Sequence, residues 1–158
     1  MKMELIQPFI NAADAVLAQS LAGTARVGEV SMEEEAYRRR GVAAVVTMRG
    51  DIEGRIIFDL ERQAAQKVAA TLAGGETPES EEWVRETICE LANQVVGNAV
   101  CSLNDQGFHF RLQPPQVHSS DVGLAGSEDT EALVMCFNTP SGRVFMNIAL
   151  RYGKDRGQ

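Results

Sequence analysis

The longest periodic segment of the chain covers residues 81–104 and reads EEWVRETICELANQVVGNAVCSLN. Apolar residues recur along it at helical spacing, so one face of a predicted helix is expected to pack in the core. That face carries Val84, Ile88, Leu91, Val95 and Ala99. Ser80 stands directly before the segment and is a favourable N-cap residue. The pattern therefore predicts a long amphipathic helix with a defined buried side.

The other side of this predicted helix carries Glu90 and Asn93, whose spacing of three residues places them on one face. Asn is worse than Ala in a helix by up to about 0.7 kcal/mol, because its amide competes for backbone hydrogen bonds. Glu86 and Gly97 extend the face by one turn in either direction. A carboxylate can hold a cation, an amide can orient a water or a phosphoryl oxygen, and glycine permits close approach. Most Glu/Asn pairs on a helix are simply a solvated face, and the residues alone favour that interpretation over a functional one.

Length and composition bound the class of protein. A chain of 158 residues corresponds to one domain, and 44% apolar and 23% charged residues are those of a globular protein. The net charge of −7 argues against a nucleic-acid partner, which demands clusters of Lys and Arg. No run approaches about 18 apolar residues, and the beginning of the sequence does not resemble a signal peptide. We therefore expect a cytoplasmic protein without a membrane partner.

The cysteines and histidines do not form a recognisable site. Cys89, Cys101 and Cys136 are odd in number and contain no C-x-x-C pair, so we expect small buried hydrophobes in a reducing compartment. His109 and His118 are too far apart to be a helical ligand pair, and no metal site is predicted. No convincing Ser-His-Asp or Cys-His combination appears, so a protein-borne nucleophile is not expected.

Two similar hairpins are predicted. The first has strands at 42–48 and 55–60, and the second has strands at 132–137 and 143–150. Each combines runs of β-branched or aromatic residues with a turn rich in Gly or Pro, and in each the second strand follows a Gly-Arg pair. We predict an α+β fold, with a largely antiparallel sheet packed against long helices.

The likeness of the hairpins indicates an internal duplication of a helix-plus-three-strand unit, at about residues 3–60 and 81–151. The first helix is predicted at about 8–21, with Pro8 in its first turn. First strands are predicted at 27–35 and 108–112.

A further amphipathic helix at 61–73 joins the two halves. Its apolar stripe contains Ala64, Ala65, Val68, Ala69 and Leu72. We expect a single domain at 1–152 followed by a polar tail at 153–158. When the two long helices are aligned by their asparagines, Asn11 falls on Asn93, but Pro8 falls on Glu90.

Three segments carry a resemblance to a known family: Glu4 to Ala12 (ELIQPFINA), Gly50 to Gly54 (GDIEG) and Glu90 to Ala99 (ELANQVVGNA). With them the chain resembles the CheC/CheX family of chemotaxis phosphatases, and its CheX-like members most. The resemblance spans about residues 3–151 and implies the duplicated CheC-like fold.

The resemblance also implies a function. The substrate would be a CheY-like receiver domain phosphorylated on Asp, and the enzyme would be an aspartyl-phosphate phosphatase. Glu90 and Asn93 would be catalytic, with Asn93 orienting the attacking water and Glu90 pairing with a receiver Lys; Glu86 and Gly97 would contact the partner. The receiver would supply Mg²⁺, so the chain needs no cofactor of its own. A homodimer is expected.

The chain departs from the family pattern at a few positions. Glu86 stands where the family usually has Asp or Ser, and Pro114 and Pro115 lie near, but not quite at, the position of a family proline. Pro8 leaves the first half without the motif Glu, which implies a single site, as in CheX-like members.

Other classes of function remain open at this point. The same fold could serve as a non-catalytic adaptor that binds a receiver or a flagellar-switch component. It could also be a structural dimerisation domain with a solvated helix face. A metal or thiol enzyme has little support from the residues.

Overall fold

A computed structural model describes residues 3–20, 26–33, 41–74, 80–118 and 132–153. The helices are α1 (Met3–Ser20), α2 (Arg62–Leu72) and α3 (Glu81–Asp105). The strands are β1 (Arg26–Glu33), β2 (Val42–Gly50), β3 (Ile52–Leu60), β4 (Phe110–Leu112), β5 (Gln116–His118), β6 (Ala132–Thr139) and β7 (Gly142–Tyr152). The predicted α+β fold class is confirmed.

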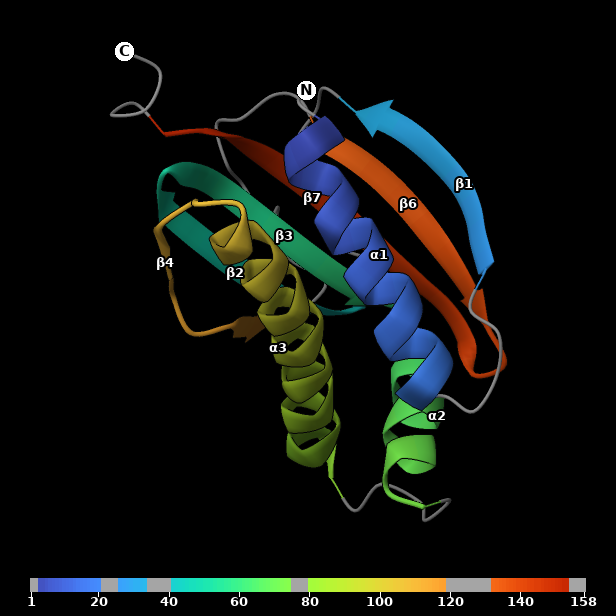
Figure 1. Ribbon diagram of the computed structural model, residues 1–158. Coiled ribbons are helices and arrows are strands. Elements are labelled where there is room, and N and C mark those ends of the chain that lie inside the picture. Colours follow the sequence, from blue (N-terminus) through green and yellow to red (C-terminus); the bar gives the residue numbers. More distant parts are fainter. Residues whose placement is uncertain (1–2, 21–25, 34–40, 75–79, 119–131, 154–158) are drawn as a thin grey trace.

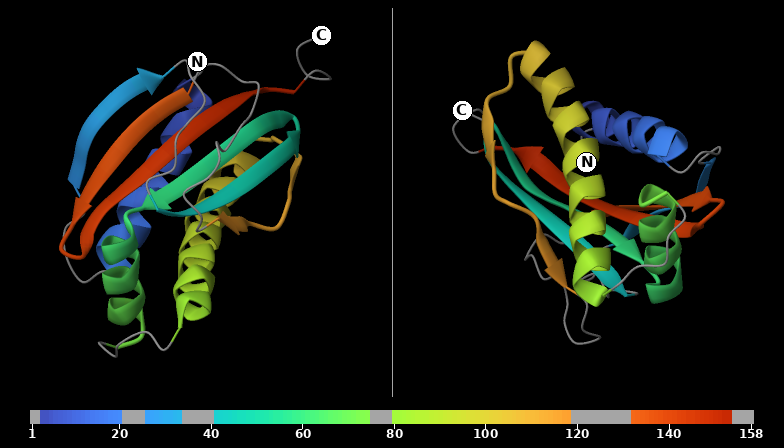
Figure 2. Two further views of the ribbon diagram at one scale, coloured as in Figure 1. Left: turned by 180° about the vertical axis from the view of Figure 1, so that it is seen from behind. Right: turned by 90° about the horizontal axis from the view of Figure 1, so that it is seen from below.

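The described strands form one sheet in the order β1-β6-β7-β3-β2-β4, with β5 also paired to β2. All of these pairings are antiparallel. Helices α1 and α3 lie side by side over one face of the sheet, and α2 packs at its end (Figure 1). From behind, the strands lie in front of the helices (Figure 2). The molecule is thus a two-layer structure.

The two hairpins meet at the centre of the sheet, where β3 pairs with β7 and Ile56 lies opposite Ile148. The first strand of each predicted half joins the other half: β1 pairs with β6, whereas β4 and β5 pair with β2. The hairpins therefore occupy related positions about the central β3–β7 pair. The division of one domain at 1–152 into two repeats stays a prediction.

The main core lies between the helices and the sheet. Phe9 from α1, Phe58 from β3 and Phe137 from β6 are among its largest buried side chains. Polar groups are buried among the strands as well: the Arg55 guanidinium donates from Nη1 to Oδ1 of Asn147 at 2.6 Å. This bond satisfies the Asn147 oxygen, whereas Asn147 Nδ2 is buried without a hydrogen-bond partner in the described structure.

Helix α3 begins at the predicted residue and buries the predicted face. The Ser80 hydroxyl accepts a hydrogen bond from the Trp83 backbone N–H at 3.1 Å, which confirms Ser80 as the N-cap. The buried residues of the helix include the whole predicted apolar face. Because this face packs against α1 and the sheet, the rotation of α3 about its axis is determined.

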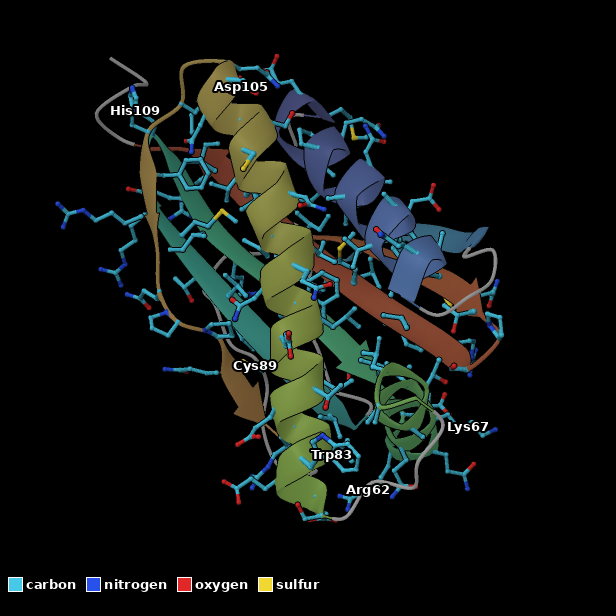
Figure 3. All side chains as sticks on the ribbon, turned by 60° about the horizontal axis from the view of Figure 1, so that its bottom comes forward. Arg62, Lys67, Trp83, Cys89, Asp105 and His109 are labelled. Carbon is cyan, nitrogen blue, oxygen red and sulfur yellow. The ribbon has the colours of Figure 1, made fainter. Side chains whose placement is uncertain are left out.

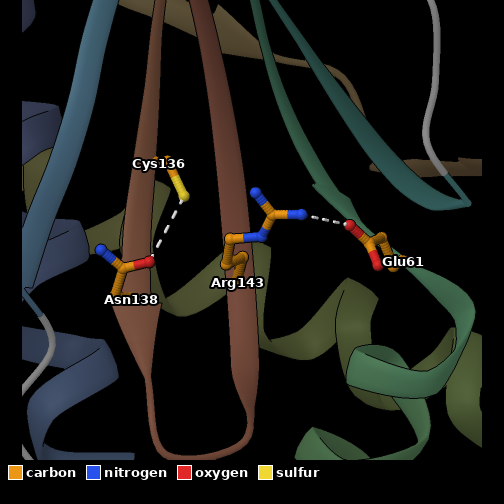
Figure 4. A network of polar contacts seen from close by, with 4 residues as sticks. All are labelled: Glu61, Cys136, Asn138 and Arg143. Atoms are coloured by element: carbon orange, nitrogen blue, oxygen red, sulfur yellow. Dashed lines mark hydrogen bonds and ion pairs between the residues drawn. The ribbon is translucent and has the colours of Figure 1, made fainter.

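Ion pairs connect the helices to the framework at the lower end of the molecule. The Arg143 guanidinium of β7 donates to Glu61, just before α2, at 2.9 Å (Figure 4). The Arg62 guanidinium donates to Glu81 at 2.7 Å and so links the beginnings of α2 and α3. Both pairs are exposed, so each contributes at most about 1 kcal/mol to stability.

The first helix differs from its prediction. It begins at Met3, so that Pro8 lies inside the helix rather than in its first turn. The early start buries Leu5 and Ile6 completely, and this burial outweighs the one backbone hydrogen bond that Pro8 cannot donate. The predicted end at Leu21 lies outside the described residues.

Other boundaries shift by a few residues. Both loops between paired strands are shorter than predicted. Strand β2 continues to Gly50, which pairs with Phe110 of β4, and the β6–β7 pairing continues to Thr139. Strand β1 ends at Glu33, and the remaining residues predicted for it lie outside the described ranges, as does the predicted tail beyond Gly153. Strand β5 was not predicted.

The predicted burial of Leu72 is also wrong. The periodic stripe of α2 predicted it to be buried, and its stripe neighbours Ala64, Ala65, Val68 and Ala69 are buried. Leu72 itself is 38% exposed. It lies in the last turn of the helix, where the packing surface that covers the rest of the stripe ends.

We predict that Gly54→Ala destabilises the protein by more than about 3 kcal/mol in urea unfolding. Gly54 has φ +136°, and a Cβ there would run into the carbonyl oxygen of Ala149 on β7. Gly107→Ala is the matched control, because Gly107 has φ +94° but no described atom within 4 Å of its Cβ position. The control should lose only about 1 kcal/mol. Equal losses in the two variants would contradict the close approach at Gly54.

Candidate functional site

The exposed stripe of α3 is formed by Glu86, Glu90, Asn93 and Gly97, and we call it the ridge. Glu86, Glu90 and Asn93 are exposed, and Gly97 is partly exposed. The structure therefore confirms that Glu90 and Asn93 lie on one exposed face of the helix. The side of α3 that carries Cys89 faces away from the sheet (Figure 3).

A shallow hollow of about 390 Å³ lies along the ridge, and we call it the ridge hollow. Its lining residues all belong to α3: Glu82, Arg85, Glu86, Cys89, Glu90 and Asn93. The structure thus brings three of the four predicted site residues to one hollow. Gly97 lies one turn farther along the helix and is not part of the lining.

The functional groups of the ridge have no hydrogen-bond or ion-pair partner within the described part of the chain. Among the described residues, neither Glu86 nor Glu90 forms an ion pair, and the Asn93 amide has no hydrogen-bond partner. The nearby Glu81 is different, because its carboxylate binds Arg62. Glu90 and Asn93 can therefore offer a carboxylate and an amide to an external group.

Gly97 has no packing role within the described part of the chain. No atom there lies within 4 Å of the position that a Cβ would take. A glycine in a helix interior costs about 1 kcal/mol relative to Ala. The glycine therefore weakens α3 without a gain inside the described structure, which is consistent with close approach of a partner.

The cysteines differ in burial, and the expectation that all are buried is wrong. Cys136 is buried, Cys89 is half-buried in the ridge hollow, and Cys101 is exposed because it lies off the apolar stripe of α3. All three are free. Burial, and then the Glu86 carboxylate, raises the pKa of the Cys89 thiol. Cys89 therefore remains a neutral thiol near neutral pH and is a poor nucleophile.

The first long helix has a polar position comparable to Asn93. Asn11 is exposed on α1, and its Oδ1 accepts a hydrogen bond from Gln7 Nε2 at 2.9 Å. Pro8 occupies the position that corresponds to Glu90. The arrangement on α1 therefore lacks the carboxylate.

The described residues do not form a recognisable metal site. Within the described ranges, no group of three or more His, Cys, Asp or Glu side chains could hold a metal ion. His109 is exposed, and its backbone N–H donates to Asp51 Oδ2 at 2.7 Å. No described helix is both long and apolar enough to cross a membrane.

Glu82 and Arg85 were not predicted as lining residues, although a helical projection places them on the same side as Glu86. A second hollow, of about 280 Å³, lies between the end of α2 and α3 and was not predicted either. Glu90 and Trp83 lie in its wall together with Leu72. The contribution of Leu72 has no local signal, because it depends on how two helices pack.

Known proteins resemble this chain in sequence and in fold. The family model described as chemotaxis phosphatase CheX matches residues 42–138. A curated relative, the CheY-P phosphatase CheX of Thermotoga maritima, is 25% identical over 120 residues, which cover 75% of this chain and 77% of the relative.

Two solved structures extend the similarity to nearly the whole chain. A CheC-like superfamily protein from Shewanella sp. PV-4 has a TM-score of 0.83 at 24% identity, covering 96% of this chain and 99% of the other, and shares the fold. The CheX–CheY–BeF3–Mg²⁺ complex from Borrelia burgdorferi provides a chain with a TM-score of 0.74 and 30% identity, covering 95% and 99%.

The family model covers more than half of the sequence, and the two-layer fold and the exposed Glu90 and Asn93 accord with it. This chain belongs to the CheX family of chemotaxis phosphatases.

Proposed function

We propose that this protein is a phosphatase that hydrolyses the aspartyl phosphate of a CheY-like receiver domain. The observation that carries the proposal is the pair Glu90 and Asn93, exposed and unengaged on α3 of a CheX-family chain. The relative from Thermotoga maritima is named as a CheY-P phosphatase, and the one from Borrelia burgdorferi was crystallised with CheY. These names support the same substrate for this chain.

The chemistry needs little from the phosphatase. A water oxygen attacks phosphorus, the bond from phosphorus to the Asp oxygen breaks, and inorganic phosphate leaves the regenerated carboxylate. Phosphoryl transfer depends mainly on positioning and electrostatics. The Asn93 amide would hold the water in line with the breaking bond, which can lower the barrier by several kcal/mol. No nucleophile on this chain is required.

Glu90 would act by charge. Its free carboxylate would pair with the receiver Lys near the phosphorylated Asp and so determine the docking register. Glu86 would add negative charge to the same contact surface, and Gly97 would let the receiver approach the helix backbone. The Mg²⁺ would be supplied by the receiver, and the chain would have no cofactor of its own.

The same proposal implies a cellular location and an oligomeric state. We infer a cytoplasmic protein, since receiver domains signal there, and a homodimer. The edge strands β1 and β4 could each pair with a second copy, because an edge strand presents unpaired backbone groups. Neither nucleic acid nor membrane is an expected partner of a chain with net charge −7.

The direct test incubates the protein with a CheY-like receiver that carries radiolabelled phosphate and follows the release of phosphate. Catalytic release well above the intrinsic rate of the receiver supports the phosphatase. Tight binding to the receiver–BeF3–Mg²⁺ complex without accelerated release would indicate the non-catalytic adaptor instead. Absence of both would contradict the proposal.

We predict that Asn93→Ala lowers kcat by about 100-fold, because it removes the positioning of the attacking water. Binding to the receiver–BeF3–Mg²⁺ complex should change by less than about threefold. The matched control is Asn11→Ala, an exposed helical Asn without the carboxylate, which should retain full activity. Both variants should keep their stability within about 0.5 kcal/mol in urea unfolding. A greater loss from Asn11→Ala would move the catalytic centre to α1.

Glu90→Ala is expected to weaken receiver binding and turnover together, each by about tenfold or more, because a docking charge acts in the ground state and in the transition state. Glu90→Gln separates charge from shape and should be impaired to a similar degree. Added salt should weaken binding of the wild type more than that of Glu90→Gln. A salt dependence that is unchanged in Glu90→Gln would argue against the ion pair.

Gly97→Ala should have opposite effects on stability and function. The free energy of unfolding should rise by about 0.5–1 kcal/mol, because Ala is the better helix former and its Cβ meets no described atom. The KM for the phosphorylated receiver should rise, since the added methyl group would obstruct close approach. Chemical denaturation and steady-state kinetics measure the two effects. A more stable variant with unchanged KM would remove Gly97 from the contact surface.

A further inference from the structure

The second hollow lies between the C-terminal end of α2 and the exposed side of α3, and we call it the interhelix hollow. Leu72 and Ala73 line it from α2, and Trp83, Thr87, Glu90 and Gln94 line it from α3. Leu91, which is buried, adds to its apolar surface. Trp83 lies on the side of α3 that faces α2 (Figure 3).

The interhelix hollow and the ridge hollow share one residue, Glu90. They are therefore adjacent depressions on two sides of the same catalytic carboxylate. A protein whose Lys reaches Glu90 covers the rim of both. The interhelix hollow is in this way continuous with the surface that the proposed function assigns to the receiver.

The wall of this hollow is mixed, with more polar than apolar surface, and its apolar part is centred on Leu72 and Trp83. Only Met3, Leu72 and Leu112 are large hydrophobic residues with substantial exposure in the described ranges. Leu72 is the one that lies beside Glu90, and it continues the buried stripe of α2 past the point where the other described residues cover it. Leu72 therefore offers an apolar contact point at the rim of the surface that carries Glu90.

Trp83 strengthens this argument. It is the only Trp of the chain, and it stands in the same wall as Leu72 rather than in the core. Aromatic side chains in partly enclosed positions dominate the energy of protein interfaces. A volume of about 280 Å³ accommodates a side chain rather than a segment of secondary structure.

We propose that the interhelix hollow binds an apolar side chain of the receiver, as an anchor next to the contact with Glu90. The proposal rests on the proposed function and adds to it a determinant of affinity that is separate from the chemistry. Leu72 and Trp83 touch none of the reacting groups, so they are binding residues, and their loss should raise KM while kcat is retained.

The kinetic test compares Leu72→Ala with Leu112→Ala. The two leucines are matched in exposure, at 38% and 40%, but Leu112 lies on edge strand β4 and lines neither hollow. Leu72→Ala should raise the KM for phosphorylated receiver by about fivefold or more, with kcat within about twofold of the wild type. Leu112→Ala should change neither. Equal KM values for the two variants and the wild type would overturn the proposal.

A charged substitution at Leu72 tests whether the side chain that occupies the hollow is apolar. Leu72→Glu should weaken receiver binding more than Leu72→Ala, because an apolar occupant is opposed by a buried carboxylate. Tighter binding of Leu72→Glu would show that the hollow receives a cationic side chain instead, next to Glu90, and would contradict the apolar anchor.

A spectroscopic test does not depend on activity. The chain labelled with 5-fluorotryptophan carries a single fluorine, at Trp83, and its aryl resonance is distinct from those of the BeF3 fluorines. Addition of the receiver–BeF3–Mg²⁺ complex should shift this ¹⁹F resonance, and the shift should be smaller in Leu72→Ala. Formation of the complex, seen by gel filtration, with an unmoved resonance would refute the anchor even if the phosphatase activity is present. Absence of any complex would instead contradict the proposed function.

Discussion

The packing of one side of α3 against α1 and the sheet is the constraint on which the rest of the structure depends. Val84, Ile88, Leu91 and Val95 are buried along this side, and each fully buried side chain of this kind is worth about 1.5–3 kcal/mol. Because a helix is rigid, burial of one stripe determines what the opposite stripe does. Glu90 and Asn93 are exposed as a direct consequence of the apolar contact behind them.

The same constraint allows α3 to carry residues that a helix would otherwise disfavour. Asn93 and Gly97 both weaken it, and Gly97 has no described packing partner in return. The Ser80 cap and the apolar stripe offset these costs from outside the ridge. Stability and proposed function are thus carried by different faces of one helix.

The sheet is the framework against which α3 is held. The two hairpins meet through β3 and β7, and each outer strand crosses to the hairpin of the other predicted half. This exchange ties the two predicted halves together, because each hairpin pairs with an outer strand of the other. Long-range pairing of this kind also keeps α1 and α3 side by side over a single core.

Much of this protein follows from local patterns. The period of 3.6 residues in a helix places Glu90 and Asn93 together and opposite Leu91, whatever the helix packs against. Turn residues and β-branched runs likewise identify both hairpins, since their signals lie within a few residues. The resemblance of the motif segments to the CheC/CheX family came from the same residues.

Other features depend on contacts between distant segments, and only the tertiary structure decides them. The burial of Leu5 and Ile6 extends α1 beyond Pro8, and the end of the α2 packing surface exposes Leu72 beside Glu90. The exchange of outer strands is of the same kind. No local pattern contains this information, because burial depends on what the rest of the chain places next to a residue.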